Sequence, residues 1–117
     1  MNLAIWDIES SSASTDFGSI IEIGGILVDE KFKEKDRFNF RCRLPEGEIP
    51  QCMALIVNRT SVNMLTKANL SHYQMLGEVE KIFKKWSPSI FLGWSNVGFD
   101  DEMIRKEFFK GIRYPYI

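Results

Sequence analysis

Near its N-terminus the chain has the stretch Leu-Ala-Ile-Trp-Asp-Ile-Glu (residues 3–9), an apolar segment that ends in two acids. Leu3–Ile8 has no capping residue before it, which predicts a strand rather than a helix. Residues two apart on a strand share a face, so Asp7 and Glu9 are expected side by side at the C-terminal end of that strand. Two such acids either bind a cation or are simply solvated.

Two further segments predict neighbouring strands. Ser19–Asp29 is rich in isoleucine and valine, which is typical of a buried central strand. Phe38–Leu44 alternates apolar and polar residues, so one of its faces is expected to contact water. The charged stretch Glu30–Arg37 between them is interpreted as a hairpin connection.

The second half of the chain predicts two helices and one more strand. Ser71 and Gln74 have the spacing of a capping box, and apolar residues follow them at helical intervals. Ser89–Trp94 is expected to be a buried strand, and Phe99–Gly111 a second helix. With a short helix near Met53–Val57, this order predicts an α/β domain in which helices pack on a mixed sheet.

The composition excludes several classes of protein. The chain has 117 residues, of which 44% are hydrophobic and 26% charged, and this fits one folded domain rather than a disordered chain. The net charge of −1 argues against a protein that coats duplex DNA. One histidine and two cysteines without a CxxC pair argue against structural zinc. The N-terminus does not resemble a signal peptide and no apolar run is long enough to cross a bilayer, so we expect a cytoplasmic chain without a membrane partner.

A second acidic segment, Asn-Val-Gly-Phe-Asp-Asp-Glu (residues 96–102), follows the last predicted strand and opens the second helix. Acids at a helix start ordinarily match the helix dipole, and this interpretation is preferred for Asp101 and Glu102. Asp100 differs, because the apolar Phe99 before it could anchor its carboxylate beside the end of the first strand. Three acids from two sheet ends suit Mg²⁺ or Mn²⁺, and such sites often serve two-metal hydrolysis of phosphodiesters.

Three stretches carry a family resemblance: Trp-Asp-Ile-Glu-Ser (6–10), Ile-Ile-Glu-Ile-Gly-Gly (20–25) and Leu92–Glu102. In the same order they resemble motifs of the DEDD superfamily of 3′–5′ exonucleases, the DnaQ-like branch of the RNase H-like fold. The last stretch is similar to that of bacterial exonuclease I. The resemblance implies one domain over residues 1–117, an RNase H-like mixed sheet flanked by helices, which stops before the last strand and helix of that fold.

The resemblance also implies an activity and a site. The activity is metal-dependent hydrolysis from the 3′ end of single-stranded DNA to nucleoside monophosphates, with two Mg²⁺ or Mn²⁺ ions in the complete domain. The implied catalytic and metal-binding residues are Asp7, Glu9 and Asp100. The implied substrate-binding residues are Asn96, Phe99, Leu55 and Ile56.

The sequence departs from the family pattern in two places. Asn58-Arg59 replaces a commoner Thr-Gly beside the substrate segment. The third motif, a histidine base followed by the fourth acid five residues later, is not found: His72 has Gly77 at that spacing and is interpreted as structural. We therefore expect little activity from this chain. Two alternatives stay open, a non-catalytic RNase H-like module that binds nucleic acid or a partner, and an exoribonuclease of the same superfamily.

Other features have two interpretations each. Basic residues at odd positions either guide a single strand of nucleic acid or form a solvated hairpin. They are Lys31, Lys33, Lys35, Arg37, Arg41 and Arg43. Glu22 is either paired internally or close to the site. The three tryptophans, Trp6, Trp86 and Trp94, are expected in the core. A sheet that stops after the Ser89–Trp94 strand would leave that edge open, which predicts a homodimer through it.

Overall fold

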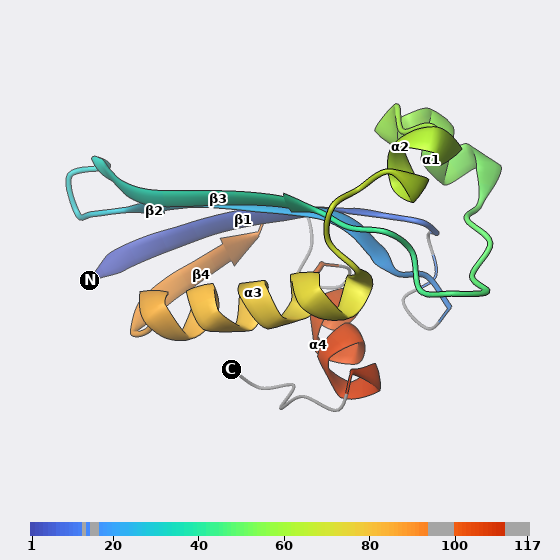
Figure 1. Ribbon diagram of the computed structural model, residues 1–117. Coiled ribbons are helices and arrows are strands. Elements are labelled where there is room, and N and C mark those ends of the chain that lie inside the picture. Colours follow the sequence, from blue (N-terminus) through green and yellow to red (C-terminus); the bar gives the residue numbers. More distant parts are fainter. Residues whose placement is uncertain (13, 15–16, 94–99, 112–117) are drawn as a thin grey trace.

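The computed structural model of the chain describes residues 1–12, 14, 17–93 and 100–111. Within these residues the strands are β1 (Asn2–Ser10), β2 (Ile20–Val28), β3 (Glu34–Arg41) and β4 (Ser89–Gly93). They form one sheet in the order β3-β2-β1-β4, with β2 antiparallel to both of its neighbours and β4 parallel to β1 (Figure 1). The predicted mixed α/β sheet is therefore confirmed.

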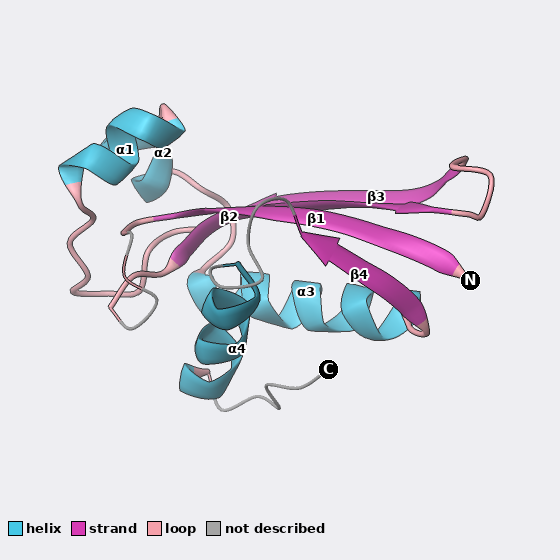
Figure 2. Cartoon of the chain, turned by 180° about the vertical axis from the view of Figure 1, so that it is seen from behind, coloured by secondary structure: helices cyan, strands magenta, loops and turns pink. Residues whose placement is uncertain are grey.

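The helices divide into two groups. α3 (His72–Trp86) and α4 (Asp100–Lys110) cover one face of the sheet, while α1 (Cys52–Asn58) and α2 (Val62–Thr66) lie beyond the end of β1 (Figures 1 and 2). None of the helices in the described part of the chain is long and apolar enough to cross a membrane. The predicted capping box is present: the Ser71 hydroxyl accepts from the backbone N–H of Gln74, and the Gln74 side chain accepts from the N–H of Ser71.

The core lies between α3 and the inner face of the sheet. Ala4, Trp6 and Ile8 alternate along β1 and are all buried on this face. The ring of Phe83 on α3 meets Trp6 edge-on, with 5.7 Å between ring centroids, and Phe91 of β4 at 5.1 Å. Edge-to-face contacts of this kind add to the free energy gained by burying the rings. The inner face of β1 is therefore packed against the core, and Asp7 and Glu9 lie on its outer face.

Two of the predicted core tryptophans lie in the described chain, and both are buried: Trp6 is 6% exposed and Trp86 is 3% exposed. The indole Nε1 of Trp86 donates to Oδ2 of Asp36 at 3.0 Å, which satisfies its buried N–H. Trp94 falls outside the described residues.

Two sequence predictions need correction, and one helix was not predicted. β3 begins at Glu34, so part of the stretch Glu30–Arg37, interpreted as a connection, belongs to the strand. The turn is shorter than predicted because the Asp29 side chain accepts hydrogen bonds from the backbone N–H groups of Lys31 and Lys33. β4 is not wholly buried, since it forms the sheet edge and Ile90 on its outer face is 48% exposed. The helix α2 was not predicted, although Ser61 caps it.

Candidate functional site

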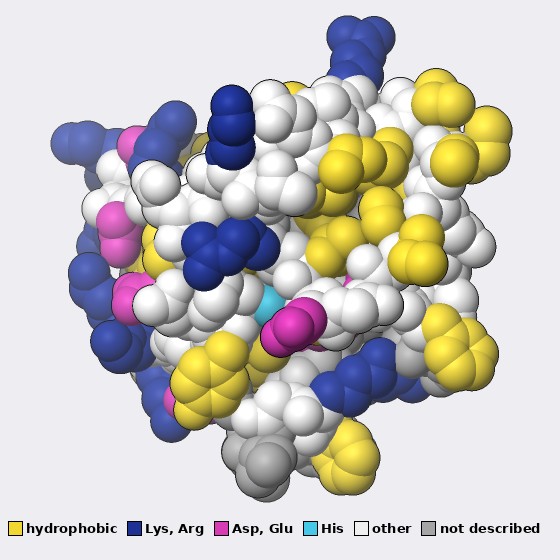
Figure 3. Space-filling model, turned by 45° about the vertical axis from the view of Figure 1, so that its right-hand side comes forward, with side chains coloured by type: hydrophobic (Ala, Val, Ile, Leu, Met, Phe, Trp, Pro, Cys, Tyr) yellow, Lys and Arg dark blue, Asp and Glu magenta, His cyan; other side chains and the backbone are white. Residues whose placement is uncertain are grey.

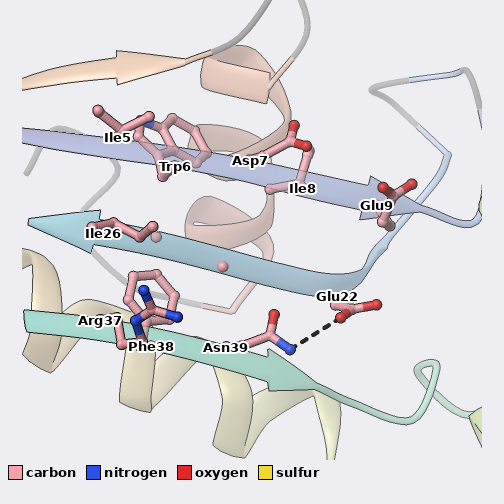
Figure 4. A pocket seen from close by; sticks show the side chains of 12 residues that line it. Ile5, Trp6, Asp7, Ile8, Glu9, Glu22, Ile26, Arg37, Phe38 and Asn39 are labelled. Atoms are coloured by element: carbon pink, nitrogen blue, oxygen red, sulfur yellow. Dashed lines mark hydrogen bonds between the residues drawn. The ribbon is translucent and has the colours of Figure 1, made fainter.

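The outer face of the sheet carries three rows of side chains, because residues in register on neighbouring strands point the same way. The rows are Glu9–Glu22–Arg41, Asp7–Gly24–Asn39 and Ile5–Ile26–Arg37. Except for Arg41, these residues line an open depression of about 610 Å³, which we call the acidic depression (Figure 4). The rows run from the acids of β1 to the polar and basic side chains of β3.

Asp7 and Glu9 lie on the same side of β1, as the strand spacing predicts (Figure 4). Asp7 is exposed and Glu9 is partly buried. The pKa of Glu9 is raised above its ordinary value, first by burial and then by the negative charges of Asp7 and Glu22. Negative charge is therefore concentrated here, and a bound cation would relieve it.

Glu22 lies directly opposite Glu9 and is also paired internally, so both interpretations of this residue hold. One carboxylate oxygen accepts from Nη2 of Arg41 at 2.9 Å, and the other accepts from Nδ2 of Asn39 at 3.1 Å (Figure 4). A Cβ on Gly24 would come within 2.9 Å of Oδ1 of Asn39. The glycine thus lets the Asn39 side chain lie close over β2.

Asp100 is the first residue of α4 and is only 5% exposed. Among the residues that the structure describes, no three Asp, Glu, His or Cys side chains are grouped as ligands of one metal ion. The structure thus brings Asp7 and Glu9 together without adding Asp100, and the three-acid site stays a prediction. Asn96 and Phe99, the predicted substrate contacts before α4, lie outside the described residues.

The acids that follow Asp100 have structural partners. Asp101 pairs with Arg105 at 3.0 Å and Glu102 pairs with Lys106 at 2.9 Å, both one turn along α4. Both residues also lie in the first turn of α4, as the helix-dipole interpretation predicts.

Leu55 and Ile56, two of the predicted substrate-binding residues, lie in α1, at the C-terminal end of β1. Nδ2 of Asn58 donates to the carbonyl of Ser10 at 2.8 Å and so joins the helix to the strand that carries the acids. Leu55 is half-buried, whereas Ile56 is 67% exposed. Among the described elements, α1 has no buried residue, so it presents an apolar surface beside the end of β1; Figure 3 shows hydrophobic side chains gathered on this part of the molecule.

The donor set of the acidic depression fits a hard divalent cation. Asp7 and Glu9 provide carboxylate oxygens from one strand, and Mg²⁺ and Mn²⁺ prefer such ligands. The single histidine lies elsewhere: His72 lines another cavity, where its Nε2 is 2.7 Å from Oε2 of Glu107.

Sequence reasoning missed Asn39 as a neighbour of the site, although the alternation of its strand places it on the same face as Arg41.

Comparisons with known proteins support this fold. No protein-family model matches the chain. The exodeoxyribonuclease I of Buchnera aphidicola subsp. Schizaphis graminum is 20% identical over 117 residues, which are 99% of this chain and 24% of that protein. The zinc-bound form of an E. coli exonuclease I–single-stranded DNA complex superposes with a TM-score of 0.90 at 20% identity, over 98% of this chain and 25% of that one.

A second solved structure gives the same result. Exonuclease I from Methylocaldum szegediense matches with a TM-score of 0.89 at 19% identity, over 98% of this chain and 25% of that chain. The present chain spans about a quarter of the length of these proteins. The predicted resemblance to exonuclease I is therefore confirmed at the level of the fold.

Proposed function

We propose that this chain is part of a metal-dependent 3′–5′ exonuclease that removes nucleoside monophosphates from single-stranded DNA. The observation that carries the proposal is the pair Asp7 and Glu9, side by side on the open face of β1. It is supported by a fold that matches exonuclease I over 98% of the chain, including an E. coli enzyme solved with single-stranded DNA and a zinc ion.

In this proposal Asp7 and Glu9 hold the metal, and Asp100 joins them as the family resemblance implies. A Mg²⁺ or Mn²⁺ ion held by these residues would activate water and neutralise charge on the scissile phosphate. Glu22 keeps Arg41 and Asn39 beside this group through its two hydrogen bonds. Asn39 lines the depression and Arg41 lies beside it on β3, where their N–H groups would contact the phosphates of the bound strand and help to position it.

The 3′-terminal nucleotide would lie against α1 in the same proposal. Ile56 and its apolar neighbours offer a surface that suits the face of a base, and Asn58 fixes that surface to the end of β1. The nucleotide would thus lie between an apolar helix and the carboxylates that hold the metal. Asn96 and Phe99 complete this part of the site in the family resemblance.

A non-catalytic module with the same fold is the second candidate. Two observations favour it: His72, the single histidine of the sequence, does not line the acidic depression, and the described acids do not form a three-ligand site. Without a histidine base the attacking water is poorly activated. For this chain alone we expect binding of DNA with little turnover.

One set of assays measures both DNA binding and turnover. Fluorescence anisotropy of a labelled dT12 oligonucleotide with Mn²⁺ should show binding that weakens at least tenfold in Asp7→Asn and is unchanged in Glu78→Gln, a half-exposed α3 residue outside the acidic depression. Equal binding by all three proteins would contradict the proposed site. Release of nucleotide from the same oligonucleotide separates the candidates: rapid turnover abolished by Asp7→Ala would refute the non-catalytic module.

We also propose that the chain forms a homodimer along β4. Within the described residues this strand pairs only with β1, so its other edge has unpaired backbone groups. Ile90 and Leu92 on its outer face are 48% and 44% exposed. Light scattering after gel filtration should give the mass of a dimer at micromolar concentration, and a monomer at every concentration would contradict this.

A further inference from the structure

A second cavity, of about 630 Å³, lies between the first turn of α3, the last turns of α4 and the segment 43–48. We call it the Glu107 pocket, after the buried acidic residue in its lining. It is separate from the acidic depression, because the two cavities share no lining residue. Figure 3 shows the histidine in a recess of this surface, between acidic and basic side chains.

Glu107 is the unusual feature of this pocket. Its side chain is only 1% exposed. Oε2 lies 2.7 Å from Nε2 of His72, whereas Oε1 is buried and accepts no hydrogen bond from any residue in the described ranges. A buried carboxylate oxygen with unused acceptor capacity is costly, and native proteins nearly always supply a donor.

The negative charge of Glu107 also affects a buried residue of the core, Cys42. The pKa of the Cys42 thiol is raised to about 12, mainly by burial and then by the negative charge of Glu107. The thiol itself donates to the carbonyl of Ile20. The carboxylate therefore faces an apolar interior on one side and the pocket on the other, so a cation that approaches it must come through the pocket.

The rest of the lining defines what kind of cation fits. Leu44, Pro45 and Leu76 provide apolar walls, and Glu46 adds a carboxylate. Glu48 accepts hydrogen bonds from serine hydroxyls. Such walls suit a methylene chain that carries a charged end group, because the chain is buried while the charge reaches its partner.

Arg43, a basic residue of the lining, is engaged elsewhere. The guanidinium of Arg43 is directed to the carbonyls of Ala68 and Asn69, at 2.8 and 3.3 Å. Lys110 belongs to the last turn of α4. An anion that entered would meet the carboxylates of Glu46 and Glu107, so the lining disfavours phosphate or carboxylate ligands.

We propose that the Glu107 pocket binds an alkylammonium group, which donates a hydrogen bond to Oε1 of Glu107 while its methylene chain packs against Leu76. The group is either a lysyl side chain of a partner protein or a free diamine. The binding is independent of the exonuclease chemistry proposed above, since none of the residues of that site takes part.

The test uses the ring signals of His72, which are unique because the sequence has one histidine. The probes are 1,5-diaminopentane, the peptide acetyl-Gly-Lys-Gly-amide and the same peptide with an acetylated lysine. Titration of the whole chain with the first two should shift the His72 signals in a saturable way, and the acetylated peptide should not. Tighter binding of the peptide indicates a protein partner, and tighter binding of the diamine indicates a free ligand.

Two variants complete the test. Glu107→Gln should weaken binding of both probes at least tenfold, whereas Glu102→Gln, on the exposed side of α4, should leave binding unchanged. If Glu107→Gln does not fold, the acetylated peptide still decides the question with the wild-type chain. No saturable shift with either ammonium probe, an equal shift with the acetylated peptide, or a shift with inorganic phosphate alone would overturn the proposal.

Discussion

Replacing Glu9 with Gln should make the metal-free protein more stable at neutral pH. Glu9 lies opposite Glu22 in the β1–β2 register, and its pKa is raised by burial and by the charges of Asp7 and Glu22. Like charges directly opposite each other on a sheet cost roughly 0.2–1 kcal/mol, and solvent screens part of this. We expect the free energy of unfolding at pH 7 to rise by about 0.5 kcal/mol.

The sign of the pH dependence follows from the raised pKa of Glu9. The folded state binds the Glu9 proton more tightly than the unfolded chain does, so the charge penalty is absent below the ordinary pKa of 4.5. The penalty develops as the pH rises through the pKa of the folded state. The advantage of the glutamine variant should therefore be present at pH 7 and vanish near pH 4.

Urea unfolding with EDTA at both pH values tests this, with Glu78→Gln as the control. A gain of ~0.5 kcal/mol moves the urea midpoint by about 0.3 M. Saturating Mn²⁺ should reverse the order, because only the wild-type protein keeps both carboxylates; at a hundredfold excess over Kd, binding adds roughly 2.7 kcal/mol. A glutamine variant that is less stable at pH 7 without metal would refute the electrostatic argument.

Two further predictions concern the parts of the fold that support the site. Phe83→Ala removes the ring that contacts Trp6 and Phe91, and should lower the free energy of unfolding by roughly 3–5 kcal/mol in chemical denaturation; a loss below ~1 kcal/mol would show that this cluster is not the core. Ser71→Ala removes the cap of α3 and should cost about 1 kcal/mol, with an unchanged far-ultraviolet circular dichroism spectrum. A neutral result would mean that the capping box does not stabilise the helix.

The elements that the sequence predicts well are those with a local physical cause. The shared face of Asp7 and Glu9 follows from the strand period alone, since residues two apart on a strand point the same way, and Ala4, Trp6 and Ile8 then lie on the other face. The start of α3 follows from Ser71 and Gln74, which satisfy each other's backbone groups whatever the helix packs against. For both features, one short stretch of sequence is enough to make the prediction.

Other features depend on contacts between distant segments. The outer face of β4 is apolar like its inner face, so composition alone does not show that Ile90 is exposed at a sheet edge. The start of β3 depends on pairing with β2 and on the bond from Trp86 to Asp36, fifty residues away. Neither partner is visible in the local pattern.

The residues of the candidate site also fall into two groups, those predictable from one strand and those that depend on contacts between distant segments. Asp7 and Glu9 are predicted together because two residues on one strand fix their relation. Asn39 joins the site only through the register of three strands and the missing side chain of Gly24. The position of Asp100 depends on how α4 packs, which the sequence pattern does not specify.

The central claim is that Asp7 and Glu9 hold a divalent metal ion. The most direct measurement is an anomalous difference map from crystals of the chain grown with Mn²⁺. We predict a peak between the two carboxylates, at about 2.2 Å from an oxygen of each, and its disappearance in Glu9→Gln. Ordered carboxylates with no peak between them, or a peak bound only by other residues, would contradict the assignment of this face as a metal-dependent nuclease site.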